Sequence, residues 1–84
     1  MPNEFKNFSD DEILNFYKKI SQNIRNLRET NGISQLDLAL SIDIKSVAFY
    51  SNCESNRYNK HFNLEHIYKI SKVLKVEIAE ILKD

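Results

Sequence analysis

Glycine and proline each occur once in this chain of 84 residues, and the proline is Pro2. Sandwiches and barrels need a turn about every 8–12 residues, and glycine and proline are among the residues that most often build such turns. Because Gly32 is the only glycine or proline after residue 2, the chain is expected to be mostly helical. This length also allows only one domain, since it cannot supply two independent cores.

Composition excludes several classes of protein. Lys plus Arg and Asp plus Glu number 12 each, so the formal net charge is +0, which excludes a polybasic tail, an acidic tail and a highly charged disordered chain. One cysteine cannot form an internal disulfide or a cysteine-cluster zinc site. No apolar run approaches the ~20 residues that span a bilayer, and residues 1–6 lack the basic start and apolar stretch of a signal peptide. We therefore expect a cytoplasmic protein with no membrane segment.

Helix signals divide the chain into a short arm over residues 1–8 and a single domain over residues 9–84. Ser9 and Glu12 match a capping box, and apolar residues then recur at the 3–4 spacing of an amphipathic helix over about 10–30. Gly32 is expected to end this helix with a left-handed cap. The apolar positions of this helix are Ile13, Phe16, Tyr17, Ile20, Ile24 and Leu27.

Three further capping residues, Ser34, Ser46 and Asn63, predict the starts of later helices. The two middle helices are short and are joined by a turn at Asp43, and the second of them stops at 55–56. Two short helices joined by a tight turn form a helix-turn-helix unit, here over about 34–54. The predicted apolar faces of the four later helices are Leu36, Leu38, Ala39 and Ile42; Val47, Phe49, Tyr50 and Cys53; Leu64, Ile67, Ile70, Ser71 and Leu74; and Val76, Ile78, Ile81 and Leu82.

The stretch Ile24-Arg25-x-x-Arg28-x-x-x-Gly32-Ile33-Ser34-Gln35-x-x-Leu38-Ala39 resembles the opening of helix-turn-helix domains of the Cro and phage-repressor (XRE) type. Ser46 through Glu54-x-Asn56, followed by Asn63-Leu64-Glu65-x-Ile67-x-x-Ile70, is similar to the second half of that motif. The resemblance covers residues 20–82. It implies an all-α, compact five-helix bundle of the lambda-repressor-like type, here with an extended first helix.

Several residues of this motif are expected to have structural roles. The resemblance implies that Glu54 fixes the third helix by pairing with Arg25 or Arg28. Gly32 and Asn56 suit left-handed turns, because glycine and asparagine tolerate positive φ. Ser34 would cap the second helix, and the small side chain of Ala39 would let another helix cross closely. Asp43 stands where the family usually has glycine.

The resemblance implies a transcription regulator that binds double-stranded DNA as a homodimer, with its third helix in the major groove. Asn52 could pair with adenine, whereas apolar residues could only meet thymine methyl groups, which predicts an A·T-leaning site or readout of DNA shape. Phe49 and Tyr50 could instead belong to the core. The residues expected to read bases are Lys45, Ser46, Val47, Ala48, Phe49 and Asn52, and those expected to contact phosphates are Gln35, Arg57, Tyr58, Asn59 and Lys60.

The zero net charge is a cancellation between segments of opposite sign. Residues 57–75 contain five Lys or Arg and one Glu, which gives +4, whereas residues 32–56 contain one Lys and three acids, which gives −2. A zero total therefore does not exclude DNA binding. The acidic helix-turn-helix segment and the lack of arginine in the third helix favour an alternative, a protein-interaction module on the same fold, antitoxin-like or a scaffold, with little or no DNA binding.

Dimerisation is expected because one such domain reads only a half-site. The preferred surface is the C-terminal stripe of Val76, Ile78, Ile81 and Leu82. The other candidate is the N-terminal region with Phe5, Phe8, Phe16 and Tyr17. Either set could instead complete the core of the monomer.

No enzyme is expected from a chain this small that lacks a catalytic motif. His61 and His66 lie five residues apart, which is not the spacing of a helical ligand pair, so no metal is predicted. No cofactor or small-molecule ligand is predicted either. Cys53 occupies an apolar helix position and is interpreted as a small buried hydrophobic residue rather than a redox sensor.

Overall fold

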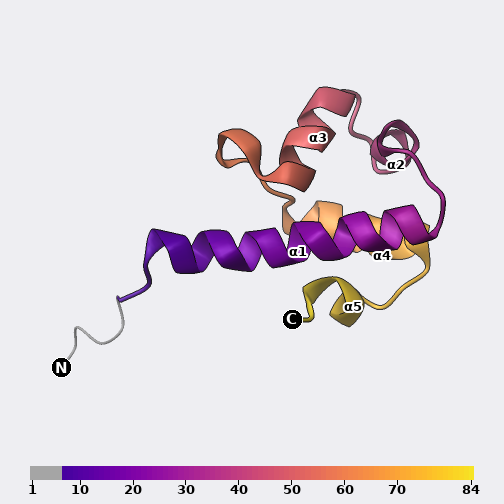
Figure 1. The fold of residues 1–84 in the computed structure, drawn as a ribbon. Coiled ribbons are helices and arrows are strands. Elements are labelled where there is room, and N and C mark those ends of the chain that lie inside the picture. The colour runs from indigo at the N-terminus through magenta and orange to yellow at the C-terminus, as the bar shows by residue number, and fades with distance from the viewer. Residues whose placement is uncertain (1–6) are drawn as a thin grey trace.

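The structure is a computed structural model that describes residues 7–84, and it is built from helices (Figure 1). The predicted all-α architecture of five helices is confirmed within these residues. Residues 1–6 of the predicted arm, including Phe5, lie outside the described part. The elements are α1 (Asp10–Thr30), α2 (Gln35–Ser41), α3 (Val47–Ser55), the short 3-10 turn η2 (Arg57–Asn59), α4 (Leu64–Leu74) and α5 (Ile78–Leu82).

The ends of α1 follow from local sequence signals. The Ser9 hydroxyl accepts a 3.0 Å hydrogen bond from the backbone N–H of Glu12. At the other end, Gly32 has a φ of +68°, and its N–H donates to the carbonyl of Glu29 while the N–H of Ile33 donates to that of Arg28. These two bonds form a Schellman motif, which satisfies the last carbonyls of the helix.

A single cluster of apolar side chains holds the helices together. Within it, α2 packs on α3, and both α3 and α5 pack against α1. Tyr50 and Cys53 of α3 are completely buried, as the apolar pattern predicted. The buried apolar residues are Ile20, Ile24, Leu38, Ala39, Ile42, Ile44, Tyr50, Cys53, Phe62, Ile67, Ile70, Leu74 and Ile81.

Several predicted apolar positions are exposed, including one in the first turn of each of α2, α3 and α4. Leu64, the first residue of α4, is 81% exposed, because the buried ring of Phe62 packs against Tyr50 where α4 begins, with ring centroids 5.3 Å apart. Leu36 on α2 and Val47 on α3 are also largely exposed. Leu36, Val47 and Leu64 each lie in the first turn of a helix. Apolar spacing places them on the side of the helix that faces the core, but the core does not extend to the end of the helix.

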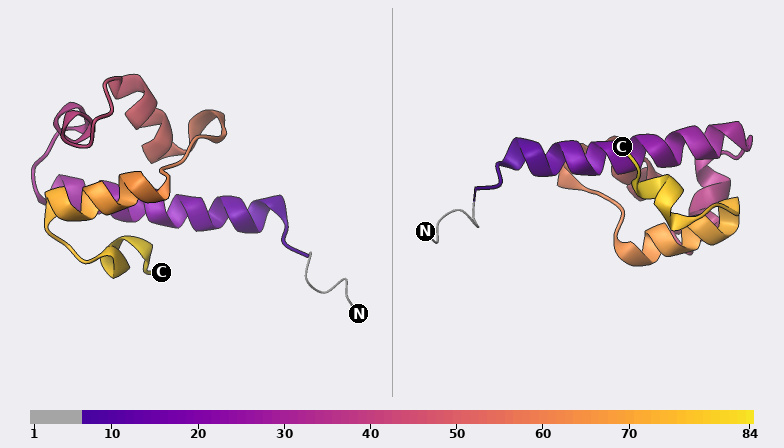
Figure 2. Two further views of the ribbon diagram at one scale, coloured as in Figure 1. Left: turned by 180° about the vertical axis from the view of Figure 1, so that it is seen from behind. Right: turned by 90° about the horizontal axis from the view of Figure 1, so that it is seen from below.

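The first half of α1 extends beyond the body of the molecule (Figure 1 and Figure 2). No residue in 10–19 is buried, and the first buried side chain of the helix is that of Ile20. Ten residues of α-helix span roughly 15 Å. We call this segment, residues 10–19, the α1 overhang.

Candidate nucleic-acid interface

The turn between α2 and α3 is set by one residue in a left-handed conformation. Asp43 has a φ of 65°, the geometry for which the family usually has glycine. The next residue, Ile44, is buried, and its N–H donates a 2.8 Å hydrogen bond to the carbonyl of Ala39. The carboxylate of Asp43 lies 3.2 Å from Nζ of Lys69 on α4. The turn is therefore fixed to α2 by the backbone and to α4 by an ion pair.

The buried carboxylate of Glu54 fixes the inner side of α3. Oε2 of Glu54 accepts hydrogen bonds from Arg28 Nε at 2.9 Å and from the Tyr50 hydroxyl at 2.7 Å. Oε1 accepts from Arg28 Nη2 at 3.1 Å and from Arg25 Nε at 3.3 Å. Both arginines thus contact Glu54, where the sequence had proposed one or the other. These contacts connect α3 to α1.

Burial alone would raise the pKa of Glu54, but the hydrogen bonds from Arg28, Tyr50 and Gln35 outweigh it and hold that pKa below its ordinary value. Burial of Tyr50, together with its hydrogen bond to Glu54, raises the pKa of the phenol. The Arg28 guanidinium also donates to the carbonyl of Ile33 at 2.8 Å. Glu54 is therefore an ionised carboxylate at neutral pH, with both oxygens hydrogen-bonded.

Gln35, one of the residues expected to contact phosphates, forms a hydrogen bond with the buried carboxylate of Glu54. Its Nε2 donates a 3.0 Å hydrogen bond to Oε1 of Glu54, and the residue is half-buried. The amide is drawn inward because Glu54 is a buried anion that binds donors strongly. The backbone N–H groups at the start of α2, which lack partners within the helix, lie beside this side chain and are also available to a phosphate.

The outer side of α3 presents a mixed polar and aliphatic surface. Lys45, Ser46, Val47 and Ala48 are exposed, and Asn52 is half-exposed. The Ser46 hydroxyl accepts a 3.1 Å hydrogen bond from the N–H of Phe49, so it serves as the helix cap. We define the reading face as Lys45, Ser46, Val47, Ala48 and Asn52.

Phe49 lies at the margin of the reading face. It is half-buried and packs against the core, and its ring is 6.3 Å from that of His66. Ser51 and Ser55 lie four and eight residues after Val47 and so are on the same side of the helix as Val47. The Ser55 hydroxyl donates to the carbonyl of Ser51 at 2.9 Å.

The loop after α3 is a turn with several residues in the left-handed conformation, and it is fixed by hydrogen bonds from the side-chain amide of Asn56. Asn56, Tyr58 and Asn59 all have φ near +57° to +59°. The Nδ2 of Asn56 donates to Ser21 Oγ on α1 at 3.1 Å, to the Cys53 carbonyl at 3.4 Å and to the Lys60 carbonyl at 3.3 Å. This amide connects the loop to both α1 and α3.

The four predicted phosphate contacts of this loop lie together at the surface. Arg57, Tyr58, Asn59 and Lys60 are all exposed, and Tyr58 is 74% exposed. We call residues 57–60 the loop clamp. The loop clamp follows the C-terminal end of α3, so its cations lie close to that end of the helix.

Comparison with known proteins adds family membership to this geometry. The family model for the helix-turn-helix of the Cro and phage-repressor (XRE) type matches residues 24–81. The chain belongs to this helix-turn-helix family. Its members are DNA-binding transcription regulators. Comparisons with curated proteins and with solved structures returned no match.

The start of the family match falls within α1 of this helix-turn-helix protein. Residue 24 lies beyond the α1 overhang, so the overhang is outside the region that the family model describes. No helix within residues 7–84 has the length and apolar character needed to cross a membrane.

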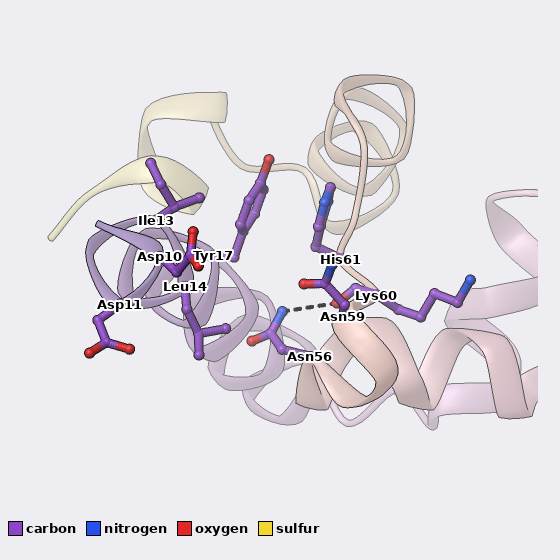
Figure 3. A pocket seen from close by; sticks show the side chains of 9 residues that line it. All are labelled: Asp10, Asp11, Ile13, Leu14, Tyr17, Asn56, Asn59, Lys60 and His61. Carbon is purple, nitrogen blue, oxygen red and sulfur yellow. Dashed lines mark hydrogen bonds between the residues drawn. The ribbon is translucent and has the colours of Figure 1, made fainter. Parts of the chain in front are cut away.

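A hollow of about 500 Å3 separates the α1 overhang from the loop that leads out of α3 (Figure 3). Tyr17 and His61 stack against each other with ring centroids 3.8 Å apart. Asp10 and Asp11 lie on the α1 side, and Asn59 and Lys60 on the loop side. The loop clamp of this helix-turn-helix protein is therefore supported by α1 through the Tyr17–His61 pair as well as through the hydrogen bond of Asn56 to Ser21.

The C-terminal stripe differs from its predicted role. Ile81 is 0% exposed, because α5 packs against α1 and turns this side chain into the monomer core, so it cannot form part of a dimer surface. Val76 is half-buried and also packs against the core. Ile78 and Leu82 remain partly exposed. The stripe is thus divided between the core and the surface.

Proposed function

We propose that this protein is a sequence-specific transcription regulator that binds double-stranded DNA as a homodimer, with α3 in the major groove. The observation that carries the proposal is the division of α3 into two sides. Its inner side is fixed by Glu54, its outer side carries the reading face, and the exposed loop clamp follows its C-terminal end. A helix held rigidly from within is suited to present side chains to base edges.

The reading face favours A·T base pairs. The Asn52 amide matches the donor and acceptor of adenine, and the side chains of Val47 and Ala48 can contact thymine methyl groups. Lys45, just before α3, can donate to guanine or to a phosphate. Because α3 contains no arginine, bidentate recognition of guanine by arginine is not available from this helix.

Affinity would come from phosphate contacts outside the reading face. The loop clamp offers Arg57 and Lys60 as cations and Tyr58 and Asn59 as neutral donors. The start of α2 adds backbone N–H groups for a second phosphate. With few cations involved, binding to non-specific DNA is expected to be weak, and its salt dependence should scale with the small number of phosphates contacted.

Two copies are needed because one domain of this size reads a half-site only. Useful affinity in this docking mode comes from two half-sites about one turn of DNA apart. The expected site is therefore a short palindrome. A cytoplasmic location, as expected from the sequence, is part of the same proposal.

Selection of bound duplexes from a random DNA library tests this function. The expected result is a palindromic, A·T-rich consensus, with binding whose log–log salt dependence has a slope of about −0.9 per phosphate contacted. Competition with poly(dI-dC) separates specific from non-specific binding. Failure to retain any duplex at ~50 mM salt, where electrostatic binding is strong, would overturn the proposal.

The same surface supports a second candidate, a protein-interaction module with little DNA binding. Leu36 and Leu40 on α2 are exposed aliphatic side chains, and Val47 of the reading face is a third. Aliphatic surface of this kind is typical of protein contacts. Exchange of Leu36 and Leu40 for serine would abolish partner binding but leave DNA binding and its salt slope unchanged, which separates the two functions.

A further inference from the structure

The α1 overhang carries an apolar stripe that the monomer does not cover. Ile13 is 44% exposed and Phe16 is 55% exposed, and both continue the line of Ile20 and Ile24, which are buried in the core. The spacing of 13, 16, 20 and 24 is that of one helix side. The side of α1 that faces the core therefore continues outward for about two turns without a partner.

A neighbouring residue of α5 widens this stripe. Leu82 is 41% exposed and lines a groove together with Phe16 and Ile20. Glu12 and Lys19 line the same groove from α1. The apolar stripe is thus bordered on one side by Glu12 and Lys19, and Asp84 lines the groove from the end of the chain.

The charges beside the stripe have opposite signs at its two ends. Glu12 and Lys19 are seven residues apart, which is two helical turns, so both flank the stripe on one side. The ion pairs formed within residues 7–84 do not include either side chain. A partner with a basic residue opposite Glu12 and an acidic residue opposite Lys19 would complement this surface.

We propose that the α1 overhang is the homodimer interface, with two copies crossing antiparallel about a two-fold axis near residues 15–16. In that arrangement Glu12 of each copy faces Lys19 of the other, because both lie about 3.5 residues from the axis on the same flank. The two Phe16 rings meet near the axis. A parallel pairing would place Glu12 opposite Tyr17 and form no such ion pair.

The self-complementary arrangement of these residues favours a second copy of this chain as the partner that binds the apolar stripe. One stretch of helix carries the apolar centre and both charges, each at the place that an isologous interface requires. This inference rests on the homodimer of the proposed function, but it concerns a surface remote from the reading face. It also replaces the C-terminal stripe with the N-terminal region as the dimer surface, with Leu82 at its edge.

Sedimentation equilibrium of the full chain without DNA tests the interface. The wild type is expected to be a dimer and Phe16→Glu a monomer. Glu12→Lys alone and Lys19→Glu alone should each weaken the dimer about tenfold, because each creates two repulsive pairs. The double variant Glu12→Lys with Lys19→Glu should recover the dimer, since the pairs re-form with reversed signs.

A matched pair of substitutions controls for net charge and for the helix terminus. Asp11→Lys and Lys18→Glu make the same charge changes one residue earlier, on the side of α1 away from the stripe. They should leave the dimer constant unchanged. Circular dichroism and thermal unfolding confirm that each variant retains the helical fold.

Three outcomes would overturn the interface. One is a wild-type monomer up to ~100 µM, a concentration at which even a weak interface would associate, as would occur if another protein or residues 1–6 cover the stripe. The second is a double variant that is no stronger than its parents. The third is an equal effect of the control substitutions. A monomer that still selects a DNA sequence refutes only the interface, whereas a dimer that binds no DNA refutes only the proposed function.

Discussion

The phenolic hydroxyl of Tyr50 donates a 2.7 Å hydrogen bond to Oε2 of Glu54, one turn further along α3, and both side chains are buried. Tyr50→Phe would leave that carboxylate oxygen with one fewer donor in a place that water does not reach. A hydrogen bond to a charged group contributes about 1.5–3 kcal/mol. We expect the free energy of unfolding in urea to fall by this amount.

Tyr68→Phe is the control for that substitution. Tyr68 on α4 is largely exposed, and its ring lies 5.3 Å from Nζ of Lys72, a contact that phenylalanine retains. The free energy of unfolding of the Tyr68→Phe variant should differ from that of the wild type by less than about 0.5 kcal/mol. Equal losses from the two substitutions would contradict the role assigned to the buried hydroxyl.

Asp43 should tolerate glycine better than alanine. Both replacements remove the ion pair with Lys69, so the difference between them isolates the backbone at φ 65°. A left-handed conformation costs a residue with a Cβ roughly 1 kcal/mol. Asp43→Ala should therefore be less stable than Asp43→Gly by about this amount in thermal unfolding, and the reverse order would mean that the turn does not require this geometry.

The stability of the fold should decrease as the pH falls below neutrality, because of His66. Burial lowers the pKa of His66, and its Nδ1 accepts a 3.1 Å hydrogen bond from the N–H of Asn63, which requires an unprotonated nitrogen. A folded-state pKa below the unfolded value of about 6.5 stabilises the protein above that pH, and the contribution is lost as the pH falls through the folded-state pKa.

Asn63 and His66 form a capping box at the start of α4, in which each side chain accepts a hydrogen bond from the backbone N–H of the other residue. His66→Gln provides the comparison, because glutamine can accept the same bond but does not titrate. Urea unfolding between pH 7.5 and 5.5 should show a smaller pH dependence for this variant than for the wild type. The lowered pKa of Glu54 adds a second loss only below about 4.5, as its carboxylate becomes protonated. A wild-type slope that His66→Gln leaves intact would rule out His66 as its source.

Asn52 and Arg57 should affect DNA binding in different ways. Asn52→Ala should change the preferred base at one position, at a cost of about 1–3 kcal/mol on the wild-type site. Arg57→Ala should weaken all sequences alike and reduce the salt slope by about 1. Library selection and salt titration of both variants measure these effects.

Lys83→Ala is a matched control for Arg57→Ala, since Lys83 follows α5 on the side of α1 away from α3 (Figure 1). It should leave both affinity and salt slope unchanged. Identical effects of Asn52→Ala and Arg57→Ala on every sequence would show that α3 lies in the groove in another register.

Local signals in the sequence were sufficient for the starts of α1, α2, α3 and α4, but not for that of α5, whose N-cap Glu77 forms no capping bond. Ser9, Ser34, Ser46 and Asn63 each cap the helix that they were predicted to cap, because a capping bond involves residues only three apart. The positive φ of Gly32 is likewise a property of the residue itself. Signals of this range do not depend on how the helices later pack.

Errors arose where the answer depends on a distant element. Ile81 is buried, and not part of a dimer surface, because α5 returns to α1. The contact of Gln35 with Glu54, 19 residues away in sequence, was likewise not visible from local pattern. The spacing of Leu64 matches the buried side of α4, yet Leu64 is exposed and the side chain of Phe62 is buried at that end of the core instead. Periodicity identifies a helix side but not how far along the helix that side is covered.

The attachment of α3 through Glu54 has a consequence for altering the protein. Tyr50, Cys53 and Glu54 hold the helix from its inner side, whereas the side chains of Lys45, Val47 and Ala48 extend into solvent. Substitutions at those three outer positions would leave the interior of the fold intact. A combinatorial library at these positions could therefore retarget the protein to new DNA sequences without first having to restore its stability.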